Sequence, residues 1–388
     1  MDRDELAAWL RLSLTPGVGN LSARRLLAAF GLPANIFNQS AQALQTCCSA
    51  AQAKALQTAP SGWAPLLDAT WTWLQAVDQP DAPARAIAPL GDPLYPSALL
   101  QTEDPPLMLY IMGPARFLQP SVLRHMRCLA MVGSRNPTPQ GQENARQFAH
   151  TLRAAGLTIV SGLALGIDAA AHEGALTAAT EDDTTPATIA VVGTGLDRVY
   201  PRQHLDLARK IARRGLLVSE YPLGTPPLAA NFPKRNRIIS GIAQGTLVVE
   251  AAPASGSLIT ARLASEQGRE VFAIPGSIHS VQSRGCHALI RQGAKLVELA
   301  QDVLEELPWP AEVARPPETP QSASCPEEPG AECHTLLTAM GFDPIGMDAL
   351  QARTGLDTAT LQVQLLDMEL AGAVSRLPGG LFQRMGRA

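Results

Sequence analysis

The chain has 388 residues, of which 46% are hydrophobic and 17% are charged, and its formal net charge is −4. This length allows two or three domains with full hydrophobic cores, and no apolar run reaches the ~20 residues that a membrane-spanning helix needs. The first five residues lack the basic and then apolar pattern of a signal peptide, and the six cysteines form no Cys-x-x-Cys pair that would indicate zinc. We therefore expect a cytoplasmic protein with reduced thiols, no metal, no cofactor and no membrane association.

Charge is distributed unevenly along the sequence. Residues 121–300 contain 19 Lys and Arg against 13 Asp and Glu, a balance of +6, whereas the other residues contain 12 against 22, a balance of −10. The local field, and not the total charge, attracts a polyanion. A nucleic-acid partner is therefore compatible with this chain, although the chain as a whole is acidic.

Residues 1–77 are predicted to form a helical domain. The stretch Leu14–Gly19, with the sequence LTPGVG, precedes a helical pattern from Ser22 to Phe30. Such a turn between helices resembles a helix-hairpin-helix, whose backbone N–H groups bind a DNA phosphate; the alternative, which we favour, is a simple turn between packed helices. Residues 78–105 are expected to form an extended linker because five prolines lie between residues 78 and 96. Four tryptophans are expected to fill the small helical core: Trp9, Trp63, Trp71 and Trp73.

A βαβ unit is predicted near the start of the segment 106–307. The apolar run Leu129–Val132 ends at Gly133-Ser134-Arg135, and apolar residues then recur with helical spacing from Ala145 to Ala155. Thr158–Val160 is predicted to be a second buried strand, which ends at Ser161-Gly162. We expect parallel strands with a right-handed connection, and the unpaired N–H groups of such loops attract anions.

Strands and helices alternate through the rest of this segment. Further strands are predicted at Leu107–Met112, Ile189–Val192, Leu216–Val218, Thr246–Glu250, Val271–Ile274 and Lys295–Val297. Helical patterns lie between them, around residues 169–179, 205–214, 238–244, 258–267 and 287–292. The fold class is therefore α/β: a doubly wound, Rossmann-like, mostly parallel sheet, flanked by the helical N-terminal domain and by a C-terminal winged-helix domain. Ligands bind at the carboxyl ends of the strands in this architecture.

The winged-helix prediction concerns residues 332–388, which follow a proline-rich linker at 308–331. Helices are expected near 334–340, 347–353 and 358–371, with a hairpin turn at Pro378-Gly379-Gly380. The expected recognition helix has no Lys or Arg but carries Asp367 and Glu369. A helix that enters the major groove of DNA has the opposite charge, so we favour a protein-contact role for this domain over DNA binding.

Signatures of catalysis are weak. Gly133-Ser134-Arg135 is not G-x-G-x-x-G, and Ser161 stands where the acid that binds a ribose is expected, which argues against a dinucleotide oxidoreductase. No Walker A motif occurs, and the His172-Glu173 pair lacks the second histidine of H-E-x-x-H. Asp168 most simply caps the helix that follows it. Glu250 is the best candidate acid for a nucleotide hydrolase, but we favour the alternative that it orients loop amides.

The basic segment 231–237, with the sequence NFPKRNR, is the most specific chemical feature. It places three cations within four positions, beside an aromatic and two amides, ahead of a predicted helix. Topology puts this segment at the same sheet edge as the glycine-rich loops, although a run of charges is also typical of a solvated face. Several anion-binding loops along one edge suit the successive phosphates of a single strand better than one nucleotide. Phe232 is placed to stack on a base.

At these residues the sequence resembles the DNA-processing protein A (DprA/Smf) family. The diagnostic stretches are Gly133-Ser134-Arg135, SGLALGIDAAAHEGAL (161–176), GTGLDRVYP (193–201), FPKRNRIISG (232–241), EAAPASGSLITARLA (250–264) and AIPGS (273–277). The resemblance implies a Rossmann-like core that binds single-stranded DNA, forms a homodimer and helps to load the RecA recombinase during natural transformation. It implies no catalysis. The same core occurs in phosphoribohydrolases, which supply the alternative function, but their P-G-G-x-G-T motif is replaced here by residues 254–257.

The predicted DNA-binding residues come from the glycine-rich loops and the basic segment, and no catalytic or metal-binding residue is predicted. They are Gly133, Ser134, Arg135, Ser161, Gly162, Gly193, Gly195, Phe232, Lys234, Arg235, Asn236, Arg237, Ser255, Gly256 and Ser257.

Overall fold

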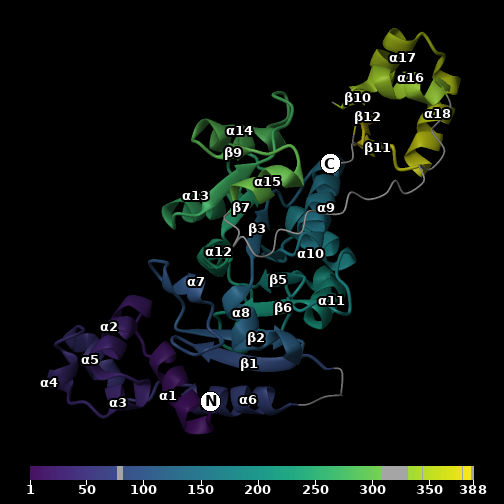
Figure 1. The fold of residues 1–388 in the computed structure, drawn as a ribbon. Helices are drawn as coiled ribbons and strands as arrows, with labels where there is room; N and C mark the ends of the chain where they lie inside the picture. The colour runs from purple at the N-terminus through teal and green to yellow at the C-terminus, as the bar shows by residue number, and fades with distance from the viewer. Residues whose placement is uncertain (77–81, 308–330, 343, 378, 386–388) are drawn as a thin grey trace.

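A computed structural model of the chain describes residues 1–76, 82–307, 331–342, 344–377 and 379–385. A nine-stranded sheet lies at its centre, with the strand order β1-β2-β6-β5-β4-β3-β7-β8-β9 (Figure 1). The seven strands from β3 to β9 are parallel, and β1 and β2 add an antiparallel edge. The strands are β1 Ala84–Pro89, β2 Met108–Gly113, β3 Cys128–Val132, β4 Thr158–Ser161, β5 Thr188–Val191, β6 Leu216–Ser219, β7 Gly245–Val248, β8 Glu270–Ala273 and β9 Lys295–Leu296.

Both faces of the sheet are buried over its central strands, which explains why these strands appear in the sequence as short continuous apolar runs. In β3, Cys128, Ala130 and Val132 pack into the hydrophobic cluster on one face. Leu129 and Met131, which point the other way because side chains alternate along a strand, pack into the cluster on the opposite face. The predicted doubly wound α/β fold is confirmed.

Helices cover the two faces in separate groups. The face that receives Leu129 and Met131 is covered by α9 (Pro139–Ala154), α10 (Ile167–Thr177), α11 (Leu205–Arg214) and α15 (Ala300–Glu306). The other face is covered by α7 (Ser97–Leu100), α8 (Pro120–His125), α12 (Asn231–Ile242), α13 (Ser257–Glu266) and α14 (Arg284–Arg291). None of the helices within the described ranges is long and apolar enough to cross a membrane.

The chain reverses its direction across the sheet at β3. Strands β3 to β6 follow one another outward, and then α12 returns the chain so that β7 pairs with the free side of β3. The loops that follow β3 and β7 therefore lie next to each other at the carboxyl ends of neighbouring strands. This is the position where open α/β sheets bind their ligands.

The predicted linker 78–105 is wrong over two stretches. Ala84–Pro89 forms the edge strand β1, which pairs with β2 from Ala84↔Gly113 to Pro89↔Met108, and Ser97–Leu100 forms α7. Prolines are typical of linkers, but an edge strand also tolerates them because one row of its N–H groups has no partner strand. Pro83 directly precedes this strand and Pro89 ends it, so these two prolines bound a strand rather than a linker.

The N-terminal helices share their core with the sheet. They are α1 (Arg3–Leu14), α2 (Asn20–Phe30), α3 (Pro33–Phe37), α4 (Ala41–Leu44), α5 (Ala50–Leu56) and α6 (Trp63–Gln75). Trp9 is buried, and the cluster that contains it also includes Met108 and Tyr110 of β2. Trp73 meets the Tyr110 ring edge-on, with the ring centroids 6.2 Å apart. The tryptophans therefore belong to the core, as predicted, but this core extends into the sheet.

The C-terminal residues form three helices and a small antiparallel sheet. The helices are α16 (Ala331–Met340), α17 (Met347–Thr354) and α18 (Thr358–Leu370), and the strands are β10 (Ile345–Gly346), β11 (Val374–Leu377) and β12 (Leu381–Arg384). β11 and β12 form the predicted hairpin. This is the expected winged-helix pattern. The predicted linker at 308–331 lies outside the described residues up to residue 330, and the exact domain boundaries stay predictions.

Candidate nucleic-acid interface

Three loops at the carboxyl edge of the sheet form one hydrogen-bonded unit. The loop after β3 is joined to the loop after β7 because Ser134 N donates to Glu250 O at 2.7 Å. It is joined to the start of α10 because Ile167 N donates to Ser134 O at 3.1 Å. Gly166 has φ +78, and a Cβ there would overlap the Ser134–Pro137 backbone region, so a glycine is required at this crossing. The loop that carries Arg135 is thus held on two sides.

The Glu250 carboxylate fixes the start of α9. Thr138 N donates to one carboxylate oxygen at 2.9 Å, and the Thr138 hydroxyl donates to the other at 2.6 Å. Thr138 is itself the N-cap of α9 and accepts from Gly141 N at 3.0 Å. Burial raises the pKa of Glu250, while the bonds from Thr138 oppose that rise. Both oxygens therefore have structural partners, which supports the orienting role over a role as a hydrolytic acid.

Asp168 does not cap α10 in the way the sequence suggested. The helix begins at Ile167 after Gly166, and the Asp168 carboxylate accepts from Gly162 N at 3.1 Å and from Ala164 N at 3.2 Å. The Ser161 hydroxyl is also directed inward, since it donates to Met131 O at 2.6 Å. The amide of Gly162 is therefore occupied by Asp168. We correct the prediction for Ser161 and Gly162: these residues support the edge from within and do not offer an open anion site.

The basic segment belongs to a helix and is not ahead of one. Since α12 begins at Asn231, Arg235 lies one turn into the helix and is only 4% exposed. Its guanidinium donates to Val191 O and lies where a Cβ on Gly162 would stand. Burial lowers the pKa of Arg235, and the neighbouring Asp168 opposes that fall. Arg235 is thus an interior residue beneath the loops, contrary to its prediction as a DNA contact.

Arg237 is also engaged inside the protein. Its guanidinium pairs with Asp104 at 3.1 Å and with Glu220, and its side chain is 16% exposed. Burial raises the pKa of Glu220, and Arg237 is the strongest influence in the opposite direction. The contacts of Arg237 therefore do not support the prediction that it binds DNA, because its guanidinium is already paired with the Glu220 carboxylate.

Two of the predicted cations remain available to a ligand. Arg135 and Lys234 are exposed, and neither has a hydrogen bond or ion pair to another described residue. The charge of Arg135 contributes, after burial, to lowering the pKa of Arg235, so the two guanidinium groups lie near each other. Arg135 projects from the loop after β3, and Lys234 projects from the first turn of α12. The structure brings two solvent-facing positive charges to this edge.

An aromatic pair lies beside these cations. Phe232 is half-buried and packs on Tyr200, with the ring centroids 5.5 Å apart and the ring planes inclined by 37°. A Cβ on Gly193 would stand 3.1 Å from the Phe232 ring, so that glycine lets the ring lie against its loop. Tyr200 is 48% exposed and was missed as a site residue. The signal was present, because Tyr200 lies inside the diagnostic stretch 193–201.

The remaining predicted residues lie at the same edge, and some of their polar groups already have hydrogen-bond partners. Gly193 O accepts from the Asn231 side chain at 3.1 Å, and Gly195 N donates to Thr225 O at 3.1 Å, so the Gly195 amide is not open to a phosphate. Ser255 and Ser257 share a hydroxyl hydrogen bond of 2.7 Å at the start of α13. A Cβ on Gly256 would meet open space, and Asn236 is half-buried on α12.

The helix-hairpin-helix-like turn is packed against the rest of the N-terminal helices. Val18 is 7% exposed, and its N–H donates to Thr15 O at 3.1 Å. Gly17 O accepts from the Gln52 side chain of α5 at 2.7 Å. These contacts support the interpretation as a simple turn. Among the described residues, no cluster of three or more His, Cys, Asp or Glu is arranged to hold a metal ion.

Comparison with known proteins covers both the core and the C-terminal part. Residues 86–308 match the family model of DNA recombination-mediator protein A, and residues 316–380 match that of the DprA winged-helix domain. Protein Smf of Escherichia coli (strain K12) is 41% identical over 324 residues, which cover 83% of this chain and 82% of Smf. DNA processing protein DprA of Streptococcus pneumoniae (strain ATCC BAA-255 / R6) is 46% identical over 216 residues, which cover 55% and 72% of the two chains.

A solved structure resembles the fold over most of its length. The X-ray structure of DNA processing protein A from Streptococcus pneumoniae matches with a TM-score of 0.63 at 35% identity, covering 80% of this chain and 99% of that one.

Proposed function

We propose that this chain, which belongs to the DNA recombination-mediator protein A (DprA/Smf) family, binds single-stranded DNA at the carboxyl edge of its sheet. One observation carries the proposal. Arg135, after β3, and Lys234, in the first turn of α12, are exposed cations without a partner among the described residues, and they share this edge with the exposed ring of Tyr200, which packs on Phe232. A positive groove with aromatic rings is how proteins bind single strands without sequence preference.

The chemistry of this edge supports binding through phosphates and base faces. Arginine forms charge-assisted, two-pronged hydrogen bonds with phosphate, and lysine adds a point charge. The aromatic pair offers a stacking surface that accepts any base. Because stacking on an aromatic ring needs an unpaired base whose face is free, we expect a preference for single strands.

Titration of labelled single-stranded and duplex DNA over a range of salt concentrations tests this function. We expect tighter binding of the single strand, and log affinity falling with log salt by ~0.7 per phosphate neutralised. Equal affinity for a duplex of the same length, or binding that does not respond to salt, would contradict the proposal.

The biological step that we propose is delivery of the bound strand to the RecA recombinase during natural transformation, by a homodimer in the cytoplasm. A dimer holds two strand segments together and raises their effective concentration. RecA-dependent strand exchange tests the delivery. It is measured with and without this protein, at a fixed excess of single-strand-binding protein. Acceleration is expected, and its absence under conditions of confirmed DNA binding would reduce the function to protection of the strand.

The winged-helix domain is proposed to contact protein in this step. Three apolar residues of α18, Val363, Leu366 and Leu370, are 61%, 55% and 80% exposed and recur at the spacing of one helix face. The same helix carries Asp367 and Glu369 and no Lys or Arg. Loss of acceleration, but not of DNA binding, after Leu366→Ser with Leu370→Ser would support this role.

We propose no catalytic activity. The hydrolase alternative depends on Glu250, whose two oxygens are both bonded to Thr138. Release of a base from a nucleoside monophosphate by the intact protein, abolished by Glu250→Gln, is the result that would restore that alternative.

A further inference from the structure

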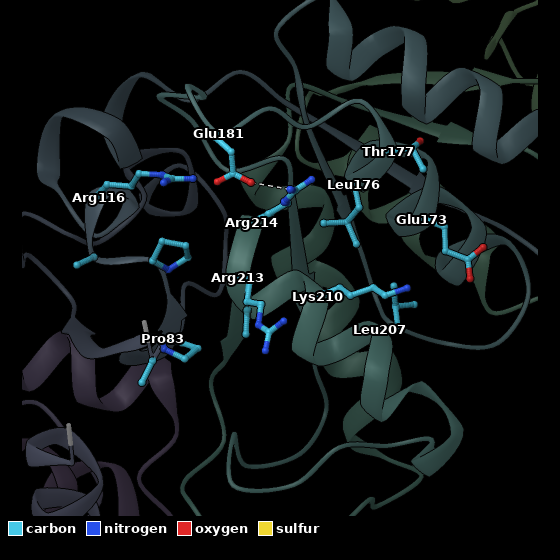
Figure 2. Close-up of a pocket in the computed structure, with 14 residues that line it drawn as sticks. Pro83, Arg116, Glu173, Leu176, Thr177, Glu181, Leu207, Lys210, Arg213 and Arg214 are labelled. Atoms are coloured by element: carbon cyan, nitrogen blue, oxygen red, sulfur yellow. Dashed lines mark hydrogen bonds and ion pairs between the residues drawn. The ribbon is translucent and has the colours of Figure 1, made fainter. Parts of the chain in front are cut away.

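A basic cavity lies at the opposite edge of the sheet from the proposed DNA interface. It has a volume of about 1450 Å³ and lies between the C-terminal halves of α10 and α11, the residues before β1 and those after β2 (Figure 2). Arg213 and Arg214 directly precede β6, whereas Arg116 follows β2, which runs antiparallel to β6. All these residues therefore lie at the amino-terminal edge of the parallel strands.

The cavity has an excess of positive charge that the described residues do not neutralise. Its lining contains Arg116, Lys210, Arg213 and Arg214 against two carboxylates, Glu173 and Glu181. Both carboxylates already have partners, since Glu173 pairs with Arg146 at 3.1 Å and Glu181 pairs with Arg214 at 2.6 Å.

Three cations of the cavity are therefore left without a carboxylate partner in the part of the chain that the structure describes: Arg116, Lys210 and Arg213. The side chains of all three residues are exposed. Figure 2 shows Arg116 extending from one wall, with Arg213 and Arg214 on the facing wall. An anionic occupant would satisfy charges that come from both sides of the cavity.

Aliphatic side chains line the space between the charges. Pro83, Pro114 and Ala115 form the accessible part of this apolar wall. Leu176 of α10 and Leu207 of α11 also line it but are only 8% and 9% exposed. The lining contains no Phe, Tyr or Trp, although aromatic stacking surfaces are what a single strand uses. The volume also exceeds the ~300–1,000 Å³ typical of small-molecule sites. The cavity thus suits a ligand that is extended, acidic and aliphatic.

We propose that this cavity docks an acidic peptide segment of a partner protein. Its carboxylates pair with Arg116, Lys210 and Arg213, and its aliphatic side chains pack against Pro83, Pro114 and Ala115. The unpaired cations require a negatively charged partner, and the aliphatic wall favours an acidic peptide over nucleic acid. The site is separate from the DNA edge, so the two ligands do not compete.

Fluorescence anisotropy with the full chain and a labelled peptide of alternating Asp and Leu tests the proposal. Lys210→Glu with Arg213→Glu should weaken binding of this peptide by about tenfold or more, since two favourable charge pairs become repulsive. The matched control is Arg209→Glu, because Arg209 lies on the same helix, is exposed and does not line the cavity. A peptide of alternating Asp and Ser should bind more weakly than the Asp–Leu peptide, and single-stranded DNA should bind all variants equally.

Several results would overturn the proposal. These are no binding of the Asp–Leu peptide to the unmodified protein, equal loss in the Arg209→Glu control, and equal binding of the Asp–Ser peptide. If a thymidine oligonucleotide displaces the peptide from the unmodified chain, the cavity is a nucleic-acid site instead. Thermal unfolding of each variant by circular dichroism separates loss of the site from loss of the fold. DNA binding measured in the same samples shows whether the proposed function fails independently.

Discussion

The double substitution Arg135→Ala with Lys234→Ala should lower the affinity for DNA without lowering the stability of the fold. Both side chains are exposed and have no partner among the described residues, so removing them should leave the thermal midpoint nearly unchanged. Each charge-assisted bond to a phosphate contributes ~1.5–3 kcal/mol, which is about 10- to 150-fold in the dissociation constant. The salt dependence should also become shallower, by ~0.7 for each phosphate contact removed and therefore by ~1.4 for the double variant.

Arg237→Ala is the informative comparison, because it removes a cation of the same segment that is already paired. Its loss leaves Glu220, with a side chain only 13% exposed, without its main partner. Breaking a buried pair typically costs ~3–5 kcal/mol, and protonation of Glu220, whose pKa burial already raises, reduces that cost. We expect a lower thermal midpoint and, for the molecules that remain folded, an unchanged salt dependence of DNA binding.

Anisotropy of a labelled single strand at several salt concentrations, together with thermal unfolding, distinguishes the two classes. If the Arg135→Ala, Lys234→Ala protein kept the parental salt dependence, these two cations would not be phosphate contacts. If the salt dependence of DNA binding also became shallower in folded Arg237→Ala protein, Arg237 would be a phosphate contact and not only a partner of Glu220.

Three further predictions follow from the same contacts. Gly162→Ala should destabilise the fold by ~1–3 kcal/mol in urea unfolding, because its Cβ would displace the buried Arg235 guanidinium. Tyr200→Ala should weaken single-strand binding by ~1–3 kcal/mol with an unchanged salt dependence, since it removes stacking and no charge. Burial and the charges of Arg235 and His204 lower the pKa of His172 to about 3. The unfolded chain therefore gains the proton first, and this contribution to stability is complete above the unfolded pKa of ~6.5 and is lost as the pH falls toward 3. Relative to His172→Gln, the unmodified protein should lose ~1.4 kcal/mol of stability between about pH 7.5 and pH 5.5 in urea unfolding.

The sheet was predictable because burial on both faces leaves a simple signature. The central parallel strands are short apolar runs, such as Leu129–Val132, bounded by glycine or polar residues. The edge strand β1 lacks this signature, since Arg85 and Pro89 interrupt its pattern. Its pairing with β2 is a long-range event that no local window contains, so a proline-rich strand was mistaken for a linker.

The site was predictable as a location but not as a set of contacts. Within α12 the buried residues Asn231, Arg235, Ile238, Ile239 and Ile242 follow one helix face. Had the helix been predicted to begin at Asn231, this spacing would have placed Arg235 inside. For Arg237 no such local signal exists, because its partners Asp104 and Glu220 come from distant parts of the sequence. Charge composition finds a basic segment, whereas the packing decides which charges face solvent.

The buried charged residues beneath this edge help to position the loop that carries the exposed cation Arg135. Asp168 with Arg235, and Glu220 with Arg237, are costly to bury, and such pairs often stabilise a fold less than apolar residues would. Here Asp168 also holds loop amides, since it accepts from Gly162 and Ala164, and the separate carboxylate of Glu250 fixes Thr138. Loops held in this way keep Arg135 near the start of α12 before any ligand arrives. Binding then orders the DNA strand but costs little conformational entropy of the protein. A smaller entropy cost raises the affinity of preorganised sites.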